Sequence, residues 1–278
     1  SFKINGETSK FHWKSRNIGG KSALDYLVKV ERMKFVDAVL ALCEESPSYI
    51  PPPSQPEQKK EFALSPAAAN NRRVFAYLMK RGISRKVIEA CVRAEILYES
   101  ADYHNAVFVG KDETGTARYA FLRGTYTKGK PFKAEVSGSE KQYCFCLPPK
   151  GKTNRLAVYE AAIETLAHLT LEGSADKWRL SLGGISAPKD GEPSRSFSFK
   201  KPLALESFLG RHPEIEELEI CTNNDFAGRW AATCLEKAYQ GRYRMVKNLP
   251  EKDGCDYADL TKERYEKQAA RQRATCSR

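Results

Sequence analysis

The sequence lacks several features that would place it in a familiar class at once. No apolar run approaches the roughly 20 residues that a membrane-spanning helix needs, and no signal peptide is visible. The 8 cysteines include no pair with C-x-x-C spacing, so we expect buried thiols and no zinc site. No G-x-x-x-x-G-K-[ST] segment occurs, so any unwinding of a duplex must come from another protein. We therefore expect a cytoplasmic protein without a membrane partner.

Positive charge, in contrast, is abundant. The 278 residues are 41% hydrophobic and 29% charged, which is typical of a folded globular protein. The net charge of +11 and the pI of about 9.2 favour a polyanionic partner, and DNA or RNA is the natural candidate. The alternative is a basic surface that only keeps the protein soluble.

Two acidic segments follow short apolar runs that are typical of buried strands. Glu160 comes directly after the run 156–159, and Asn223 and Asp225 come just after the run 218–221. Carboxylates at the carboxyl ends of neighbouring parallel strands converge where open α/β sheets bind their ligands. Oxygen ligands gathered there suit Mg²⁺. The sequence therefore predicts an acidic site for a divalent cation.

The two segments resemble the toprim domain that bacterial primases, topoisomerases and some nucleases share. In primases, one strand ends in E-G-x-x-x-D, and a later strand ends in D-x-D followed by x-A-G-R. The first motif falls on Glu160, Ala161 and Glu164. The second falls on Asn223, Asp225 and Ala227-Gly228-Arg229, and a K-D-x-D-like element falls on 252–256.

The resemblance implies a site and a chemistry. It implies Mg²⁺ or Mn²⁺ as the cofactor and phosphoryl transfer as the reaction, with Glu160 and Asp225 as the catalytic residues. The implied metal ligands are Glu160, Asn223, Asp225, Asp253 and Asp256. Glu160 as a general acid or base is an alternative role. Alanine at 161 and asparagine at 223 depart from the pattern, and the lost carboxylate at 223 weakens the expected site.

The N-terminal part divides into a module and a linker. Residues 1–45 show helical periodicity at 23–30 and 36–42, and they resemble the second half of the zinc-binding domain of bacterial primases. Trp13 and Arg16 stand at the cysteine positions of its F-x-C-x-x-C-x-x-G-G pattern, so the resemblance implies a degenerate helical module without zinc. Proline-rich residues 46–66 are the expected linker.

Residues 67–150 are predicted to form a small α+β basic subdomain. Its order of elements resembles the subdomain that precedes toprim in primases, and resembles still more a toprim-associated domain of unassigned function from mobile elements. Arg123, Lys133 and Lys141 are the residues expected to face nucleic acid, together with Arg229 of the A-G-R match.

Alternating strands and helices over 151–260 predict an α/β toprim domain with a mostly parallel sheet flanked by helices. Gly183-Gly184 is expected to be a turn near the site, and residues 261–278 a charged C-terminal tail. A strand-breaking topoisomerase is disfavoured, because no tyrosine is placed as a nucleophile.

Two classes of function remain open. The first is an enzyme, either a primase-like nucleotidyltransferase or a toprim nuclease, that serves replication of a plasmid or mobile element. The second is a nucleic-acid-binding protein that keeps the fold but has impaired catalysis. The expected partners are single-stranded DNA and nucleotides, with a separate helicase or relaxase.

Overall fold

The protein is described by a computed structural model, which covers residues 2–6, 8–45, 61–126, 129, 131–188 and 199–276. The chain divides into two compact units, Ser1–Gln58 and Lys59–Arg278. Most of the expected linker 46–66 and the polar insertion expected at 189–198 lie outside the described residues.

The first unit contains a small sheet as well as helices. The strands β1 (Phe2–Ile4), β2 (Phe11–Trp13) and β3 (Ile18–Gly20) pair antiparallel, and α1 (Ala23–Lys29) and α2 (Phe35–Glu45) follow. Both helices of the expected helical module are present, and the three short strands before them were not predicted. Strands of three residues are too short to show an alternating pattern. At the two positions where the zinc-binding pattern has cysteine, the Arg16 guanidinium lies 4.1 Å from the centre of the Trp13 ring.

The second unit is built on a five-stranded, mostly parallel sheet. Its order is β12-β11-β9-β10-β8, and its strands are β8 (Cys146–Leu147), β9 (Arg155–Tyr159), β10 (Trp178–Ser181), β11 (Glu217–Ile220) and β12 (Arg244–Lys247). All neighbours are parallel except β8, which pairs antiparallel with β10 at the edge. The sheet agrees with the parallel arrangement that the alternating pattern predicted.

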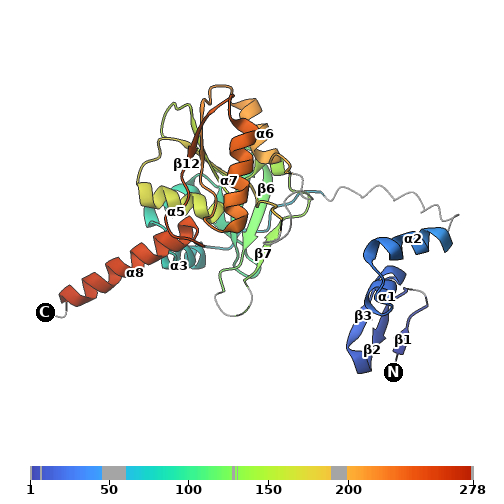
Figure 1. Cartoon of the computed structure of the whole chain (residues 1–278). Helices are drawn as coiled ribbons and strands as arrows, with labels where there is room; N and C mark the ends of the chain where they lie inside the picture. The colour runs from blue at the N-terminus through green and yellow to red at the C-terminus, as the bar shows by residue number, and fades with distance from the viewer. Residues whose placement is uncertain are drawn as a thin grey trace. The chain divides into compact units, whose positions relative to one another are not determined.

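Helices cover both faces of this sheet (Figure 1). On one face, Leu156 and Val158 of β9 pack with α6 (Leu203–Arg211) and α7 (Phe226–Tyr239). On the other face, Ala157 and Tyr159 pack with α5 (Ala162–Glu172) and α8 (Tyr257–Cys276). The period-two alternation along β9 thus supplies both halves of the core.

A second, antiparallel sheet has the order β4-β5-β6-β7. Its strands are β4 (Leu97–Glu99), β5 (Ala106–Lys111), β6 (Ala117–Arg123) and β7 (Lys133–Glu135), and its helices are α3 (Arg72–Lys80) and α4 (Arg85–Arg93). One hydrophobic core joins this antiparallel sheet to the five-stranded sheet, with Leu78, Phe108 and Phe145 packed together with Leu166 of α5.

The boundary predicted between residues 150 and 151 therefore does not separate two bodies. The strand β8 precedes this boundary, yet it completes the parallel sheet beside β10. A two-residue strand carries no sequence signal for the sheet it will join, which is why the sequence assigned it to the preceding subdomain.

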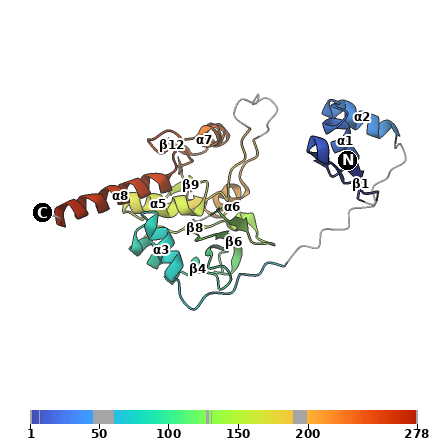
Figure 2. The ribbon, with the colours of Figure 1, turned by 90° about the horizontal axis from the view of Figure 1, so that it is seen from below.

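The expected C-terminal tail is the continuation of a packed helix. The helix α8 begins at Tyr257, runs beside α5 and projects beyond it (Figures 1 and 2). Its first turns are buried, and the Thr261 hydroxyl donates to the Ala167 carbonyl at 3.3 Å. Within the described ranges, no helix is both long and apolar enough to cross a membrane.

The expectation of buried thiols holds for part of the cysteines. Cys91, Cys144 and Cys221 are buried, whereas Cys43 on α2 is exposed. A buried ion pair also lies in the core, between Lys177 and Glu219, at 2.5 Å.

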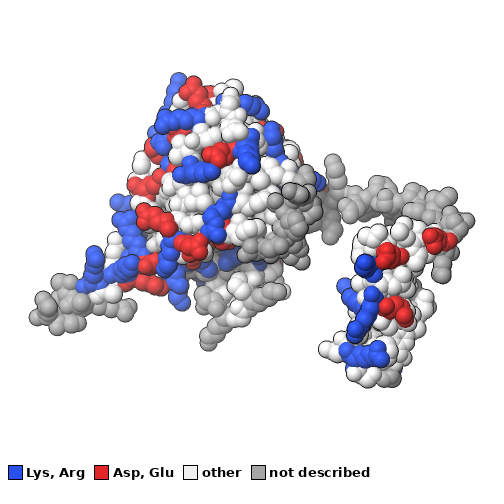
Figure 3. All heavy atoms as spheres, viewed as in Figure 1, with Lys and Arg blue, Asp and Glu red and all other residues white. Residues whose placement is uncertain are grey.

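Charged side chains of both signs are mixed on the surface of the second unit. On the face that Figure 3 shows, blue Lys and Arg atoms alternate with red Asp and Glu atoms over this unit. The positive charge is therefore not gathered into one patch on that face.

Candidate functional site

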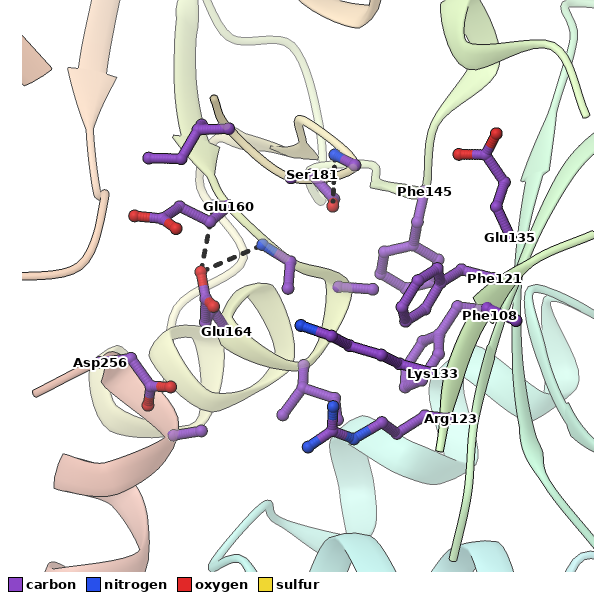
Figure 4. Close-up of a pocket in the computed structure, with 18 of the residues that line it drawn as sticks. Phe108, Phe121, Arg123, Lys133, Glu135, Phe145, Glu160, Glu164, Ser181 and Asp256 are labelled. Atoms are coloured by element: carbon purple, nitrogen blue, oxygen red, sulfur yellow. Dashed lines mark hydrogen bonds between the residues drawn. The ribbon is translucent and has the colours of Figure 1, made fainter. Parts of the chain in front are cut away.

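A cavity of about 620 Å³ lies between the carboxyl end of β9 and the antiparallel sheet (Figure 4). Three kinds of side chain line it. The acidic and amide residues are Glu160, Glu164, Asn223 and Asp256 on one side and Glu135, the partner of Lys141, on the other. The basic residues are Arg81, Arg123, Lys133 and Lys141, and the aromatic residues are Phe108, Tyr119, Phe121 and Phe145.

Glu160 is positioned by the tight turn from β9 into α5. Ala161, which stands where the primase pattern has glycine, is the N-terminal cap of α5, with φ −135° and ψ 157°. These are extended angles that any L-residue adopts, so alanine introduces no strain here. The buried Glu164 carboxylate accepts the N–H groups of Glu160 and Ala161 at 3.0 and 3.1 Å, which fixes the turn.

The A-G-R match has a steric reason. A Cβ atom at Gly228 would lie 2.0 Å from the Asn223 carbonyl oxygen, so only glycine lets α7 begin against this backbone. The same backbone orients the Asn223 N–H, which donates to Glu160 Oε1 at 2.9 Å. The lack of a side chain at Gly228 thus permits the backbone position from which the Asn223 N–H reaches Glu160.

The remaining predicted acids do not all reach the cavity. Asp256 lines it, but Asp225 does not, and its Oδ1 accepts the Gly228 N–H at 2.7 Å as the cap of α7. Asp253 has an 86% exposed side chain and is paired with Arg229 at 2.5 Å. The structure therefore brings Glu160, Asn223 and Asp256 together and places Asp253 and Arg229 outside the cavity.

Burial and mutual repulsion dominate the electrostatics of the acidic wall. The pKa of Glu160 is raised to about 7, mainly by burial and to a lesser extent by the charges of Asp225 and Asp256, while the hydrogen bond from the Asn223 N–H lowers it. Burial also raises the pKa of Asp256, and it raises that of Glu164 well above the usual range. None of these three carboxylates has an ion pair with a residue in the described part of the chain.

Such an acidic wall fits a divalent cation. Buried carboxylates without basic partners are unfavourable unless a cation or protons neutralise them. Carboxylate oxygens, with a neutral amide oxygen from Asn223, are the hard donors that Mg²⁺ or Mn²⁺ prefers. Glu160, Asp256 and Asn223 are the residues that would hold such an ion.

The basic wall stands opposite. Arg123 and Lys133 are register partners on β6 and β7, and Lys133 extends into the cavity towards Glu164 (Figure 4). The Arg123 Nε donates to the Tyr77 hydroxyl at 3.2 Å. Lys141 lines the cavity and pairs with Glu135 at 3.4 Å. All three basic residues predicted for the subdomain thus face the same space as Glu160.

The Gly183-Gly184 segment is a turn at the cavity, as the sequence predicted. Both residues have positive φ, 70° and 98°, and both line the cavity. The Gly184 N–H donates to the Glu160 carbonyl at 2.8 Å, so the turn also holds the end of β9.

Arg81 and the aromatic side chains were not predicted as site residues. Arg81 stands at the end of α3 just before Gly82, where a sequence pattern indicates only a helix terminus. The aromatic residues belong to strands whose hydrophobicity indicates a core. These aromatic residues lie beside the basic wall because of the way the two sheets pack. The apolar pattern of single strands does not predict that packing.

A second cluster could hold a metal by geometry alone. Ligand atoms of the buried residues His168, Glu219 and Cys221 lie within 4.8 Å of one another. Both Glu219 oxygens are already used, however, by Lys177 at 2.5 Å and by Asn248 at 2.6 Å. An adjacent lysine charge opposes a cation, so we assign this cluster to the core.

Comparisons with known proteins give three kinds of result. Residues 76–152 match a family described as a protein of unknown function (DUF3991). No match is found among curated protein sequences. Solved structures, in contrast, include several that are similar to this chain.

Three of these structures come from primases. The zinc-binding and RNA polymerase domains of the Aquifex aeolicus primase are similar at 16% identity, over 98% of this chain and 74% of theirs, with a TM-score of 0.47. The primase fragment of the bacteriophage T7 primase-helicase is similar at 14% identity, over 95% of this chain and 90% of that one, with a TM-score of 0.47. A DnaG primase catalytic domain bound to single-stranded DNA is similar at 17% identity, over 69% of each chain, with a TM-score of 0.44.

Proposed function

We propose that this protein is a primase-like enzyme that carries out Mg²⁺- or Mn²⁺-dependent nucleotidyl transfer on DNA. The observation that carries the proposal is the shared cavity. It brings Glu160, Asn223 and Asp256 to one wall and Arg123, Lys133 and Lys141 to the other.

The two walls divide the chemistry of phosphoryl transfer. A divalent cation at the acidic wall would supply charge neutralisation and alignment of the attacking oxygen. The guanidinium of Arg123 and the ammonium of Lys133 bind phosphate oxygens from the opposite side and hold the reacting groups in place. The turn fixed by Glu164 keeps the Glu160 carboxylate oriented before the substrate arrives.

The finer setting follows from the resemblance of the sequence. It is replication of a plasmid or mobile element, in which a separate helicase or relaxase supplies the single-stranded template. Nucleotides are the small-molecule substrates of such a reaction.

A second candidate is a nucleic-acid-binding protein of toprim fold with impaired catalysis. Asn223 favours it, because an amide contributes no charge at a position where the pattern has a carboxylate. Asp225 favours it as well, because its oxygen is used to cap α7.

Calorimetric titration with Mg²⁺ and Mn²⁺ separates the two candidates. We expect the wild type to bind, and Glu160→Gln and Asp256→Asn to weaken binding at least about tenfold, the loss typical even of an outer-shell partner. Asp253→Asn is the matched control, since that acid is exposed outside the cavity. Asp225→Asn keeps the helix cap, so any loss of affinity in that variant reports the charge of Asp225.

The result decides what is assayed next. Metal binding that depends on Glu160 and Asp256 leads to assays of primer synthesis and of nicking. A wild type that binds no metal at millimolar concentration contradicts the enzymatic proposal and leaves the DNA-binding protein.

A further inference from the structure

One face of α3 carries a row of alternating arginine and tyrosine side chains. Arg73, Tyr77 and Arg81 are spaced four residues apart, so they lie on the same face of the helix at intervals of about 6 Å along its axis. The end of β6 adds Arg123 and, shortly after the strand, Tyr126. We call these five residues the arginine–tyrosine row.

Contacts within the row connect the cavity to the surface. The Arg81 guanidinium lies 4.9 Å from the centre of the Tyr77 ring, and the Arg123 Nε donates to the Tyr77 hydroxyl. Arg81 and Arg123 both line the cavity. At the outer end, Arg73 lies 5.4 Å from the centre of the Tyr126 ring, and its Nη1 donates to the Tyr126 hydroxyl at 2.6 Å.

The arginine side chains of the row form no ion pair in the described part of the chain, although the charge of Arg81 favours the ionised form of Asp256. Many arginines of the second unit, such as Arg118, Arg155 and Arg179, form ion pairs with carboxylates. Among the described residues, no ion pair involves an arginine of the row, and tyrosines are their contacts instead. These guanidinium groups therefore remain available to an anion.

Exposure differs along the row. Tyr77 is only 7% exposed and supports the guanidinium groups around it. Tyr126 is 61% exposed, so its ring offers a free face to solvent. A large exposed ring held in place by an arginine is a suitable surface on which a planar group can stack.

We propose that the arginine–tyrosine row is a track for single-stranded nucleic acid leading out of the cavity. Arginines contact the phosphates, and a base stacks on Tyr126. Proteins that bind single strands combine these two elements, a line of positive charge and exposed aromatic rings. A duplex does not fit this chemistry, because its bases are stacked on one another. The track deepens the proposed function, since its inner end is the cavity that holds Glu160.

The test is fluorescence anisotropy with a labelled oligothymidine and with a hairpin duplex of equal length. We expect Tyr126→Ala to weaken binding of the single strand at least about fivefold, as loss of one stacked base implies. Tyr126→Phe keeps the ring and should bind as the wild type does. Arg73→Gln should lower the slope of log affinity against log salt concentration by about 1.

Arg85→Gln is the matched control. Arg85 also lies over an aromatic ring, that of Phe75 at 5.7 Å, but it is on α4 and is paired with Glu89. We expect Arg85→Gln to bind the single strand with the affinity of the wild type and with the same slope of log affinity against log salt concentration. On the wild type, photocrosslinking with 5-iodouracil in the oligonucleotide should label Tyr126, which tests the contact without any substitution.

The outcomes distinguish the track from the proposed function. Unchanged binding by Tyr126→Ala together with crosslinks elsewhere overturns the track, while metal binding at Glu160 stands. A wild type that binds no single strand at all overturns the track and the DNA-directed function together.

Discussion

Glu160 combines two requirements that conflict in the absence of a ligand. Its position at the end of β9 places the side chain in the lining of the cavity, and the same position buries the carboxylate beside other acids. An ionised group is unfavourable in such surroundings unless a cation compensates for it. The residue therefore links the stability of the protein to the state of the site.

This link predicts a pH-dependent effect of Glu160→Gln. The folded pKa of about 7 lies above the ordinary value of 4.5 for a glutamate, so the folded state binds the proton more tightly and loses stability as the pH rises through this window. Without divalent metal, the variant should be more stable than the wild type at pH 8 by about 1–3 kcal/mol. The difference should vanish at pH 4.

Urea unfolding at both pH values measures this effect. Added Mg²⁺ should reverse it by stabilising only the wild type. Equal stabilities of the two proteins at pH 8 without metal would contradict the burial of an uncompensated charge at this position.

A second residue-scale prediction concerns Gly228. Gly228→Ala forces a methyl group against the Asn223 backbone, so the free energy of unfolding should fall by at least about 2 kcal/mol. Gly210→Ala in α6 is the control, because a Cβ atom there meets nothing within 4 Å. That variant should be unchanged or stabilised by up to about 1 kcal/mol. Thermal unfolding of both variants compares them, and similar effects would contradict the steric argument.

The sequence predicted the positions of some site residues better than those of others. Glu160 and Asn223 each follow a buried apolar run, so the strand pattern places them at one edge of the sheet. Arg229 lies in α7 and Asp253 lies in a loop, and the ion-pair partner of each depends on the local geometry of the chain. Their ion pair at 2.5 Å could not be derived from spacing.

At the scale of elements, a buried ion pair connects the parallel sheet to the chain that follows α5. The side chains of Lys177 and Glu219 are only 3% and 5% exposed, and the Lys177 Nζ also donates to Glu172 at 2.7 Å. Removal of Lys177 leaves the buried Glu219 carboxylate with Arg155 as its cationic partner, at a longer distance of 3.7 Å.

Lys177→Met should therefore lower the free energy of unfolding by about 3–5 kcal/mol. The matched control is Lys247→Met, because the Lys247 pair with Glu236 is partly exposed. That variant should change stability by less than about 1 kcal/mol. Urea unfolding measures both, and a small effect of Lys177→Met would show that the buried charges are neutralised in another way.

Elements that coincide with an apolar run or a helical period were predictable, and the strands of the first unit were not. The helix α5 and the strands β9 and β11 appear where the apolar pattern placed them. The strands β1 to β3 have three residues each, and a period cannot be recognised over such a length. Pairing of β8 with β10 depends on contacts distant in the sequence.

At the scale of the molecule, the cavity belongs to one unit only. Every residue that lines it lies within Lys59–Arg278. A chain that begins at Lys59 should therefore bind Mg²⁺ with the affinity of the whole protein, within about twofold. Calorimetry on both proteins compares them, and a loss of affinity in the shorter one would assign part of the site to residues 1–58.

The core that the two sheets share also has a mechanical consequence. The basic and acidic walls of the cavity rest on sheets that pack into one hydrophobic core, in which Phe145, directly before β8, contacts Phe108 of β5. Because this core holds both sheets, we expect the walls to keep a constant separation, as a caliper locked at one setting does. The protein would then select its substrate by whether the distance between two of its charged groups matches that setting, and not by closing around it.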